Sequence, residues 1–432
     1  MDSTPALPEY RDSAEREADL LTRLPALIAR AMQAPGWAQR LHGVTPATIT
    51  TRAQLAQLPL TRKSALRDLQ AALPPLAGLN TTAPHGLRRL FVSPGPIIDP
   101  EGHGSDWWRF APALRALGLQ RGDLLHNCFS YHFTPAAFMV EGAAAALGCV
   151  VIPAGTGQTD LQVQAIASLR PSTYIGTPSF LKLILDKADA SGVRLDSLQR
   201  ALVSGEALPP SLRSELRARG IGQVLQLYAS ADLGCIAYET GSETGSAGAV
   251  DPGMVVAEEI LLEIVTPGTG APVQPGQVGE VVVTTFNADY PLIRFATGDL
   301  SAALPTALPT RGSTAHTNHR IVGWKGRADQ SAKVRGMFVH PAQVAQVVRR
   351  FSAILRARLL IEGEPGADTM TLHCEVDGFN AATGGIAGGA ALSAAVSQAI
   401  REETALRGEA VLVAPNSLPN DGKVIDDLRR HT

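Results

Sequence analysis

Cysteine motifs, aromatic residues and net charge are all sparse in this sequence of 432 residues. The four cysteines lie far apart and form no C-x-x-C pair, which argues against a zinc or disulfide framework and for a reduced protein. Aromatic residues make up only 5%, although apolar residues as a whole reach 45%, enough for sizeable cores. Thirty-eight basic and forty acidic residues leave a net charge of −2. Neither nucleic acid nor an anionic membrane is therefore expected as the main partner.

The sequence also lacks an uninterrupted apolar run of the length that a membrane helix needs. Its most apolar stretch, residues 135–153, contains Glu141 and several glycines and ends in the strand-like CVVIP. We interpret it as a helix followed by a strand. Residues 1–16 are polar and charged, so we expect no secretory signal. These features predict a cytoplasmic protein that does not enter a membrane.

The order of apolar and amphipathic stretches predicts an α/β fold, and the length suggests two or three domains. A helix-rich opening includes a helix over residues 14–32 and a short helix capped by Thr61. From residue 88 to 285, apolar runs alternate with helical stretches, which indicates a doubly wound, mostly parallel sheet. Buried strands are expected near residues 90, 124, 149, 173, 201 and 224, with helices at 106–117, 160–169 and 178–190. Ligands of such sheets bind beyond the carboxyl ends of the strands.

The pattern changes after residue 253. The runs EEILLEIV and VGEVVVTTF, separated by a Gly/Pro-rich loop, predict a β-rich subdomain. Residues 320–341, RIVGWKGRADQSAKVRGMFVHP, combine charges with three glycines and must lie at a surface. They predict either a hinge between two bodies or an ordinary basic hairpin. A hinge here would lie near residues 326–330, between a large domain (1–325) and a small α+β domain (326–432).

Five sequence blocks occur in an order that is typical of one protein family. They are LVSGEALP from Leu202, LQLYASAD from Leu225, RFATGDL from Arg294, GWKGRADQSAKVRGMFVHP from Gly323 and LPNDGK from Leu418. Together they resemble the AMP-forming adenylating enzymes, and most of all the phenylacetate-CoA ligase branch. The resemblance implies an acyl-CoA synthetase-like fold, with an AMP- and acid-binding N-terminal domain and a mobile C-terminal lid. It also implies an ATP-dependent acid-CoA ligase that uses ATP, Mg²⁺ and coenzyme A.

By the same resemblance, these blocks would hold the nucleotide. Asp299, which follows a Thr-Gly turn, would accept hydrogen bonds from both ribose hydroxyls. Tyr228 would stack near adenine, and Ser230 would touch the phosphates. Asp232 would bind Mg²⁺ where most of the family has Glu, which is one methylene longer. The adenine site would be lined by Gly205 and Glu206. A strand-to-helix turn beside a helix N-terminus explains that last block equally well.

Basic residues near the hinge and the C-terminus are candidates for catalysis and coenzyme A binding. Lys423 follows a Pro-Asn-Asp-Gly turn that can present a long cationic side chain. By resemblance it bridges the acid carboxylate and the α-phosphate during adenylation. Arg327 would reach the ribose beside the hinge. Lys333, Arg335 and Gly336 would face coenzyme A, whose phosphates favour basic partners, although a basic surface strand has the same pattern.

The phosphate-binding loop departs from the family. Most adenylating enzymes have a Ser/Thr/Gly-rich loop that ends in a lysine, whereas this chain has FVSPGPIIDPEG from Phe91. The prolines of this loop have no N–H, and only Ser93 and Gly95 keep part of the pattern. Either phosphate is bound differently, with help from Arg88, Arg89 or Arg109, or ATP turnover is weakened or lost.

Two stretches would form the acid-binding site, NCFSYHFTPAAF from Asn127 and TYIGTPSFL from Thr173. Their aromatic lining favours an aromatic or other apolar acid. The candidate residues are Tyr131, His132, Phe133, Phe138 and Phe180. His132 would orient a carboxylate or simply line the wall. The segment ETGSETGSAG from Glu239 has no cysteine, so we expect no structural zinc.

Three functions are compatible with this interpretation of the sequence. The leading one is a ligase that makes an acyl-adenylate and pyrophosphate, and then an acyl-CoA and AMP. The second is an adenylate-forming enzyme with an acceptor other than coenzyme A. The third is a non-catalytic, ligand-binding homologue whose phosphate loop has degenerated. A homodimer is expected by resemblance only.

Overall fold

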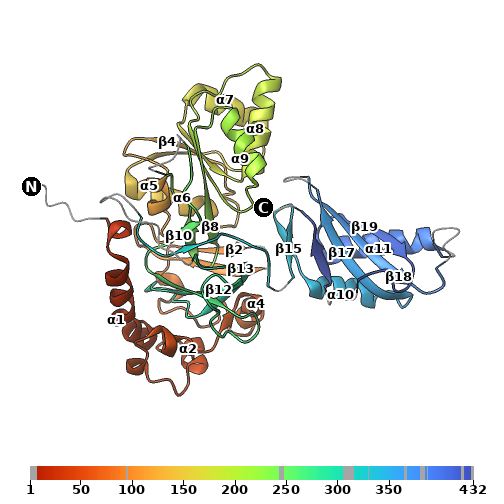
Figure 1. The fold of residues 1–432 in the computed structure, drawn as a ribbon, viewed down its shortest axis with the longest axis horizontal. Coiled ribbons are helices and arrows are strands. Elements are labelled where there is room, and N and C mark those ends of the chain that lie inside the picture. The colour runs from red at the N-terminus through yellow and green to blue at the C-terminus, as the bar shows by residue number, and fades with distance from the viewer. Residues whose placement is uncertain are drawn as a thin grey trace, which may run out of the picture. The chain divides into compact units, whose positions relative to one another are not determined.

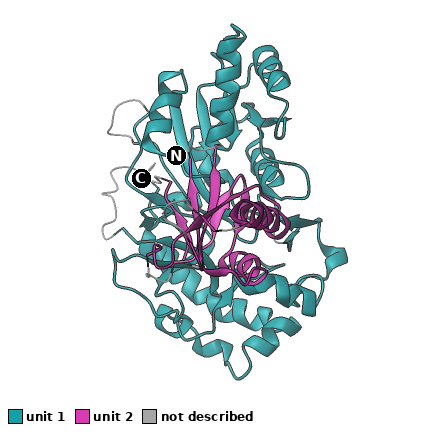
Figure 2. Ribbon diagram, turned by 90° about the vertical axis from the view of Figure 1, so that its right-hand side faces the viewer, with its two compact units in different colours: residues 1–326 teal, residues 327–432 magenta. Residues whose placement is uncertain are grey.

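The computed structural model describes residues 7–93, 96–242, 248–304, 316–328, 330–363, 367–379, 385–386, 388–419 and 423–429. The chain divides into two compact units, residues 1–326 and 327–432, which Figure 2 shows in different colours. Each unit has a hydrophobic core of its own. Among the helices of the described residues, none is both long and apolar enough to span a membrane.

Helices occur in the large unit both in its first eighty residues and between the strands that follow. They are α1 (Ser13–Ala31), α2 (Pro35–Arg40), α3 (Arg52–Leu55), α4 (Lys63–Ala72), α5 (Ala111–Ala116), α6 (Ala136–Leu147), α7 (Thr159–Leu169), α8 (Pro178–Ala190) and α9 (Pro210–Ala218). Short 3-10 turns occur at η1 (Pro8–Tyr10), η2 (Pro46–Thr48) and η3 (Pro84–Gly86). The helix expected over residues 14–32 is thus confirmed as α1.

The strands of the large unit form two sheets and a separate hairpin. They are β1 (Thr61–Arg62), β2 (Arg89–Ser93), β3 (Ile97–Glu101), β4 (Leu124–Asn127), β5 (Val150–Pro153), β6 (Thr173–Gly176), β7 (Arg200–Val203), β8 (Gln223–Ser230), β9 (Gly234–Tyr238), β10 (Met254–Val256), β11 (Ile260–Val265), β12 (Gly279–Thr285), β13 (Phe295–Ser301) and β14 (Arg320–Ile321).

The largest sheet is doubly wound, as the alternation of strands and helices predicts (Figure 1). Its order is β14-β10-β9-β8-β7-β6-β4-β5, and the neighbours from β8 to β5 are parallel. Successive side chains of a strand point to opposite faces. One face packs with α6 through Leu125, Ile175, Leu202 and Leu225. The other packs with α7, α8 and α9 through Tyr174, Ala201, Val203 and Val224.

Two expectations for this unit are wrong because local pairing differs from the expected pattern. The strand expected near residue 90 is β2, which within the described part of the chain pairs only with β3, in an antiparallel hairpin outside the parallel sheet. Leu90 and Val92 on it are 45% and 41% exposed, so only one of its faces is buried. Thr61 caps no helix, because it lies in β1 and pairs with Phe295 of β13.

The helix expected over residues 106–117 is shorter than predicted. It begins at Ala111, because the Asp106 carboxylate accepts hydrogen bonds from the N–H groups of Phe110 and Ala111, both at 2.8 Å. Asp106 itself has a φ of 45°, outside the helical range. A carboxylate that satisfies the first free N–H groups of a helix fixes where the helix starts.

The β-rich subdomain is a four-stranded sheet of order β1-β13-β12-β11, with β1 parallel to β13 and the remaining pairs antiparallel. It contains the runs that predicted it, in β11 and β12. Since β13 carries the Thr-Gly-Asp motif, the pairing of β1 places the start of α4 beside that motif.

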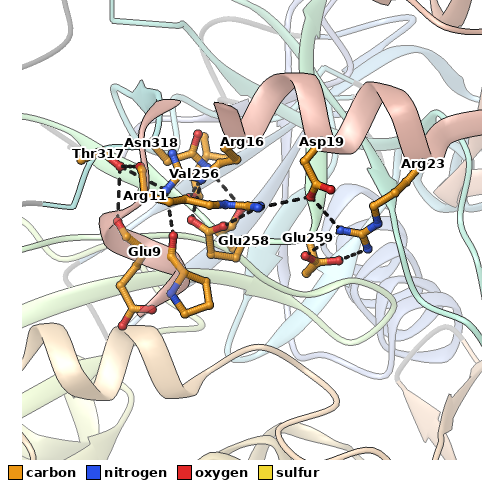
Figure 3. A network of polar contacts seen from close by, with 12 residues as sticks. Glu9, Arg11, Arg16, Asp19, Arg23, Val256, Glu258, Glu259, Thr317 and Asn318 are labelled. Atoms are coloured by element: carbon orange, nitrogen blue, oxygen red, sulfur yellow. Dashed lines mark hydrogen bonds and ion pairs between the residues drawn. The ribbon is translucent and has the colours of Figure 1, made fainter. Parts of the chain in front are cut away.

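Charged side chains hold α1 against the segment that follows β10 (Figure 3). The buried Arg16 donates to Glu258 at 2.7 Å and to Thr317 at 3.1 Å. Arg23, further along the same helix, donates to Asp19 and Glu259. Burial lowers the pKa of Arg16 and raises that of Glu258, each against the effect of the other's charge. The helical opening is therefore an integral part of the large unit.

The small unit is an α+β fold, as expected for the last hundred residues. Its strands are β15 (Ala332–Val334), β16 (Met337–Val339), β17 (Ile354–Glu362), β18 (Thr369–Val376), β19 (Glu409–Val413) and β20 (Ile425–Asp427), and its helices are α10 (Pro341–Arg349) and α11 (Gly389–Thr404). The main sheet has the order β19-β18-β17-β20, and β15 and β16 form a separate hairpin. Sequence reasoning missed β20, which is only three residues long and adds to the sheet edge beside β17.

Candidate active site

Asp299 lies in β13 and joins two distant sequence blocks. Its Oδ2 accepts a hydrogen bond from the Tyr228 hydroxyl at 2.8 Å, and its Oδ1 accepts one from the Trp324 indole N–H at 3.1 Å. Gly298, with a φ of 76°, and the 3.0 Å hydrogen bond from Asp299 N–H to the Thr297 hydroxyl set the backbone of this turn. Both carboxylate oxygens thus accept hydrogen bonds from neutral donors.

The block around Tyr228 lies at the carboxyl end of β8, where the sheet order changes from parallel to antiparallel. The Ser230 hydroxyl accepts from the Leu233 N–H at 3.2 Å, which closes the turn into β9. Asp232 lies within this turn and its side chain is fully buried. The sheet therefore presents Tyr228, Ser230 and Asp232 at the edge where ligands of doubly wound folds bind.

A buried carboxylate pair and one lysine lie beside this turn. Lys63, the first residue of α4, forms an ion pair with Asp232. Asp99, 1% exposed on β3, accepts a short hydrogen bond from the Ser93 hydroxyl on β2. Burial and the nearby Asp232 carboxylate raise the pKa of Asp99 well above its usual value. Burial lowers the pKa of Lys63, but Asp232, Asp99 and Asp299 raise it by more, so the lysine stays charged.

The donor set at this place fits a hard divalent cation. The Oδ1 atoms of Asp99 and Asp232 are both buried without a hydrogen-bond partner. Mg²⁺ typically takes one or two protein carboxylates and completes its shell with phosphate oxygens and water. The described residues contain no cluster of three or more His, Cys, Asp or Glu side chains able to hold a metal. Asp232, with Asp99 beside it, therefore suits the metal role expected of position 232.

Arginines near the unusual loop are engaged elsewhere. Arg88 and Arg89 both pair with Glu101, at 3.7 and 2.9 Å. The Arg109 side chain donates to the Leu233 carbonyl, directly after Asp232. Residues 94–95, in the middle of the loop, lie outside the described residues.

Gly205 and Glu206 follow β7, one strand away from Tyr228 in the sheet. Gly205 has a φ of 83°, which favours glycine. The Glu206 carboxylate accepts from the Ser179 hydroxyl at 2.6 Å in the first turn of α8, and its backbone carbonyl accepts from Gln226 at 3.4 Å. The helix N-terminus that Glu206 approaches is thus that of α8.

The aromatic residues expected at the acid site fall into three places. Tyr131 and Phe138 pack edge to face at 5.4 Å between ring centroids, and Phe91 contacts Phe138 at 5.3 Å. The Tyr131 hydroxyl also donates to Glu141 at 2.8 Å and accepts from Asn127 at 3.0 Å. By contrast, His132 and Phe133 pair with each other on an exposed turn, where Phe133 is 64% exposed. Phe180, in the first turn of α8, packs against the other core cluster.

In the small unit, the candidate residues of the hinge motif gather around Phe338. The Arg327 guanidinium lies over this ring at 5.1 Å and donates to the Ser331 hydroxyl at 2.9 Å. Lys333, directly opposite Phe338 in the β15–β16 pair, lies 5.9 Å from the ring centre. Its neighbours Arg335 and Gly336 form the hairpin turn, with φ values of 47° and 83°. Residues 332–339 are therefore a basic hairpin.

Lys423 lies half exposed directly before β20. Its Nζ forms an ion pair with Asp426 at 3.0 Å, and the neighbouring Val424 N–H donates to Gln330 at 2.9 Å. The end of the hinge motif and the lysine are thus close within the same unit. The turn of residues 420–422 that precedes Lys423 lies outside the described residues.

Sequence reasoning missed three residues of the site. Trp324 lies in the hinge motif but binds Asp299, and an indole N–H next to a glycine gave no signal of that partner. Lys63 was assigned to a structural helix, and Asp99 to a loop. The apolar alternation that buries Asp99 opposite Phe91 was the available signal for the β2–β3 hairpin.

Part of this chain is similar to AMP-binding enzymes. The AMP-binding enzyme family matches residues 107–287, which run from just before α5 to just after β12. The chain is a relative of the AMP-forming adenylating enzymes, on their phenylacetate-CoA ligase-like side, as its motifs indicated.

Two curated relatives and one solved structure illustrate the similarity. The phenylacetate-coenzyme A ligase of Aromatoleum evansii is 27% identical over 346 residues, which cover 78% of this chain and 75% of the relative. That of Thermus thermophilus is 28% identical over 377 residues, covering 82% and 80%. A 2-hydroxyisobutyryl-CoA ligase structure superposes with a TM-score of 0.80 at 22% identity, covering 98% of this chain and 91% of its own. The structural likeness confirms the acyl-CoA synthetase-like fold.

Proposed function

We propose that this protein is an ATP-dependent, AMP-forming acid-CoA ligase that activates an aromatic or other apolar carboxylic acid. The observation that carries the proposal is the meeting of three separate motifs at one carboxylate, since Tyr228 and Trp324 both donate to Asp299. The curated relatives are phenylacetate-CoA ligases, which supports acid-CoA ligase chemistry with ATP and coenzyme A as co-substrates.

In the adenylation step, an oxygen of the acid attacks the α-phosphorus of ATP and pyrophosphate leaves. We assign Asp299 to the ribose hydroxyls, where a carboxylate with oriented oxygens serves as the acceptor. Tyr228, Gly205 and Glu206 line the adenine side, and Ser230 contacts phosphate. Asp232 would hold Mg²⁺, which would supply positive charge to the phosphates. Lys423 and Arg327, from the small unit, complete the electrostatic stabilisation of the α-phosphate and ribose.

In the second step, the coenzyme A thiol attacks the acyl carbon and AMP leaves. We assign the basic hairpin of Lys333, Arg335 and Gly336 to coenzyme A, because its phosphates favour basic partners. Within this proposal the large unit is the AMP- and acid-binding domain and the small unit the mobile lid domain, with the hinge near residues 326–330.

For the acid, the proposal favours the group around Tyr131, Phe138 and Phe91. These rings contact one another, and a cluster of rings suits an aromatic or aliphatic acid. The hydroxyl of Tyr131 is already paired with Glu141. His132 and Phe133 remain candidates as an exposed rim, and Phe180 as a wall on the far side of the strands.

The proposal also includes a cytoplasmic homodimer, which rests on the sequence expectations alone. Light scattering at several protein concentrations tests the assembly: a mass near twice the 45.4 kDa of one chain supports it.

The experiment that tests the function is pyrophosphate release with ATP and Mg²⁺ across aromatic and aliphatic acids, with and without coenzyme A. Release that depends on one class of acid and rises with coenzyme A supports the ligase. Acid-dependent release that coenzyme A leaves unchanged points to another acceptor. Measurable ATP binding without release for any acid points to a ligand-binding protein, and contradicts the ligase.

A further inference from the structure

The chain has only six lysines against thirty-two arginines, and Lys63 is the sole lysine before Lys182. Arginine is this sequence's ordinary choice for a surface or ion-pair cation. A lysine differs in offering a compact point charge on a flexible stem, which suits contact with a phosphate group. The position of Lys63 inside the candidate site therefore calls for a specific explanation.

The fold places Lys63 beside the nucleotide motif through strand pairing. Thr61 pairs with Phe295 and Arg62 with Ala296 in parallel register, so α4 starts level with Thr297. The Thr61 N–H also donates to the Arg294 carbonyl at 3.0 Å. A two-residue strand whose only sheet partner is β13 thus fixes where the lysine side chain emerges.

Lys63 lies between the buried carboxylate of Asp232 and the solvent. The Asp232 side chain is 0% exposed, whereas that of Lys63 is 24% exposed. Among the described residues, Asp232 is the single hydrogen-bond partner of the ammonium group. An ammonium has three N–H donors, so two remain for a ligand on the accessible side.

The surroundings of Lys63 need a cation before they can accept a phosphate chain. Asp99, Asp232 and Asp299 lie near enough to act on its charge. Carboxylates repel phosphate, and the repulsion is strong where water is excluded. Ser93, which belongs to the loop where phosphates are expected, is hydrogen-bonded to Asp99. A cation at this place offsets the carboxylates, one of which, Asp99, is hydrogen-bonded to Ser93 of that loop.

The loop itself cannot provide that cation. Residues 91–102, FVSPGPIIDPEG, contain no lysine or arginine, and their three prolines have no N–H to donate. Arg88 and Arg89, just before the loop, are paired with Glu101. Lys63 reaches the same area from a different segment of the chain.

We propose that Lys63 binds the β- and γ-phosphates of ATP and serves as the cation that the proline-containing loop lacks. This inference rests on the proposed ligase function. During adenylation the bond between the α-phosphorus and the bridging oxygen breaks, and negative charge grows on the departing pyrophosphate. The ammonium stabilises that charge by hydrogen bonding, and no proton changes place.

The inference is tested by comparing nucleotides that differ only in these phosphates. We expect Lys63→Met to weaken ATP binding about 10- to 100-fold by calorimetry, and AMP binding by less than about 2-fold, because a charge-assisted hydrogen bond is lost only with ATP. Acid-dependent ATP–pyrophosphate exchange falls by a similar factor. Thioester formation from supplied acyl-adenylate and coenzyme A stays within about 3-fold, since no pyrophosphate takes part.

Two further variants control for the ion pair and for general effects of losing a lysine. Lys63→Arg keeps a cation beside Asp232 and should retain the melting temperature, with ATP affinity between those of the wild type and Lys63→Met. Lys182→Met removes a lysine that pairs with Asp186 and Glu215 at the surface, and should leave both affinities unchanged.

A purely structural role for Lys63 gives a different result. If the lysine only neutralises Asp232, then ATP and AMP affinities of Lys63→Met fall together. In that case the double variant Lys63→Met/Asp232→Asn, which leaves no unpaired buried charge, binds ATP as well as Asp232→Asn alone. This outcome overturns the inference. A double variant that binds ATP at least about 10-fold more weakly than Asp232→Asn supports it.

These measurements separate the inference from the ligase function. A wild type that shows no adenylation with any acid, but whose preference for ATP over AMP depends on Lys63, contradicts the ligase and upholds the phosphate contact. Full adenylation by Lys63→Met contradicts the phosphate contact and upholds the ligase.

Discussion

The candidate site of the large unit keeps its charges inside the protein, whereas the lysine proposed for catalysis in the small unit lies at the surface. Asp232 is fully buried against Lys63, and both oxygens of Asp299 are oriented by Tyr228 and Trp324. Lys423, by contrast, has a side chain that is 52% exposed. The large unit thus holds acceptors in fixed positions, and the small unit presents the Lys423 ammonium at its surface.

The physical consequence concerns reorganisation. Buried, hydrogen-bonded groups cost little to orient at the moment of reaction, because folding has already oriented them. An exposed ion pair such as Lys423–Asp426 contributes at most about 1 kcal/mol, so its lysine can leave that partner at small cost. The comparison therefore predicts that large-unit variants affect nucleotide binding and that Lys423 affects the chemical step.

The largest expected effect is that of Lys423→Ala. We expect adenylation to fall by about 1000-fold, or about 4 kcal/mol, with ATP affinity within about 3-fold of the wild type. Single-turnover formation of acyl-adenylate measures the first quantity and calorimetry the second. Thioester formation from supplied acyl-adenylate should be spared, and loss of both steps to the same extent would remove Lys423 from this role.

Lys333→Ala is the matched control within the small unit. It removes a second lysine, one that lies over Phe338 in the basic hairpin. We expect adenylation to be unchanged within about 2-fold and the KM for coenzyme A to rise by about 3- to 10-fold, as for one phosphate contact at an exposed site. Equal effects of the two variants on adenylation would erase the distinction between the two lysines.

The next largest effect is expected for Asp299→Asn. An amide has one acceptor where the carboxylate has two, so its NH₂ faces either Tyr228 or Trp324, and the ribose loses a charged acceptor. We expect kcat/KM for ATP to fall by about 100-fold, or about 3 kcal/mol.

Asp289→Asn is the matched control for that variant. Asp289 likewise accepts from a hydroxyl, that of Thr82 at 2.6 Å, and from an indole N–H, that of Trp107 at 3.1 Å. It lies outside the proposed nucleotide motifs, so its substitution should lower stability without changing the relative affinity for ATP and AMP. If Asp289→Asn reduces nucleotide affinity as much as Asp299→Asn, the ribose assignment is wrong.

A pH-dependent difference between the units is expected from His316. Burial lowers its pKa to about 4, and the nearby Arg320 and Arg115 act in the same direction, against Glu9 and Asp251. The folded pKa lies below the unfolded value, so the stabilisation is complete above about pH 6.5 and is lost as the pH falls toward 4. We expect the large unit to lose about 2 kcal/mol over this range through His316 alone.

Tryptophan fluorescence measures this loss in the large unit alone, because all four tryptophans lie within residues 1–326. His316→Asn keeps a polar partner for the Tyr238 hydroxyl, 2.9 Å from the ring nitrogen in the wild type. In urea titrations at pH 7, 6, 5 and 4, it should lose stability less steeply than the wild type. Substitution of the exposed His42 by Asn should leave the slope unchanged, and an equal slope for His316→Asn would contradict the pKa argument.

The sequence revealed the features that depend on local patterns. Alternating strands and helices predicted the doubly wound sheet, because its central strands are short, largely apolar and buried on both faces. The motif around Asp299 predicted a site near Tyr228, and the two are hydrogen-bonded. Local motifs carry such information when the fold brings the ends of neighbouring elements together.

The parts that the sequence did not reveal depend on long-range pairing. Lys63 meets Asp232 across 169 positions, and a two-residue strand brings it there. Nothing in the local pattern distinguishes that strand from a helix cap at Thr61. The aromatic residues 131–138 looked like one wall, but the turn at Phe133, with a φ of 62°, turns two of them outward. Loop conformation, and not composition, decides which rings line a site.

The smallest effect is expected for Tyr228→Phe, which tests whether the tyrosine hydroxyl serves nucleotide binding alone. The substitution removes one neutral donor to Asp299 and keeps the ring, so Trp324 still orients the other oxygen. We expect the KM for ATP to rise about 3- to 10-fold, or about 1 kcal/mol, with kcat within about 2-fold. Trp324→Phe should behave alike, and the double variant should lose more than the sum, because Asp299 is then left without either oriented contact. A large drop in kcat for Tyr228→Phe would instead place the tyrosine in the chemical step and break the division of labour between the two units.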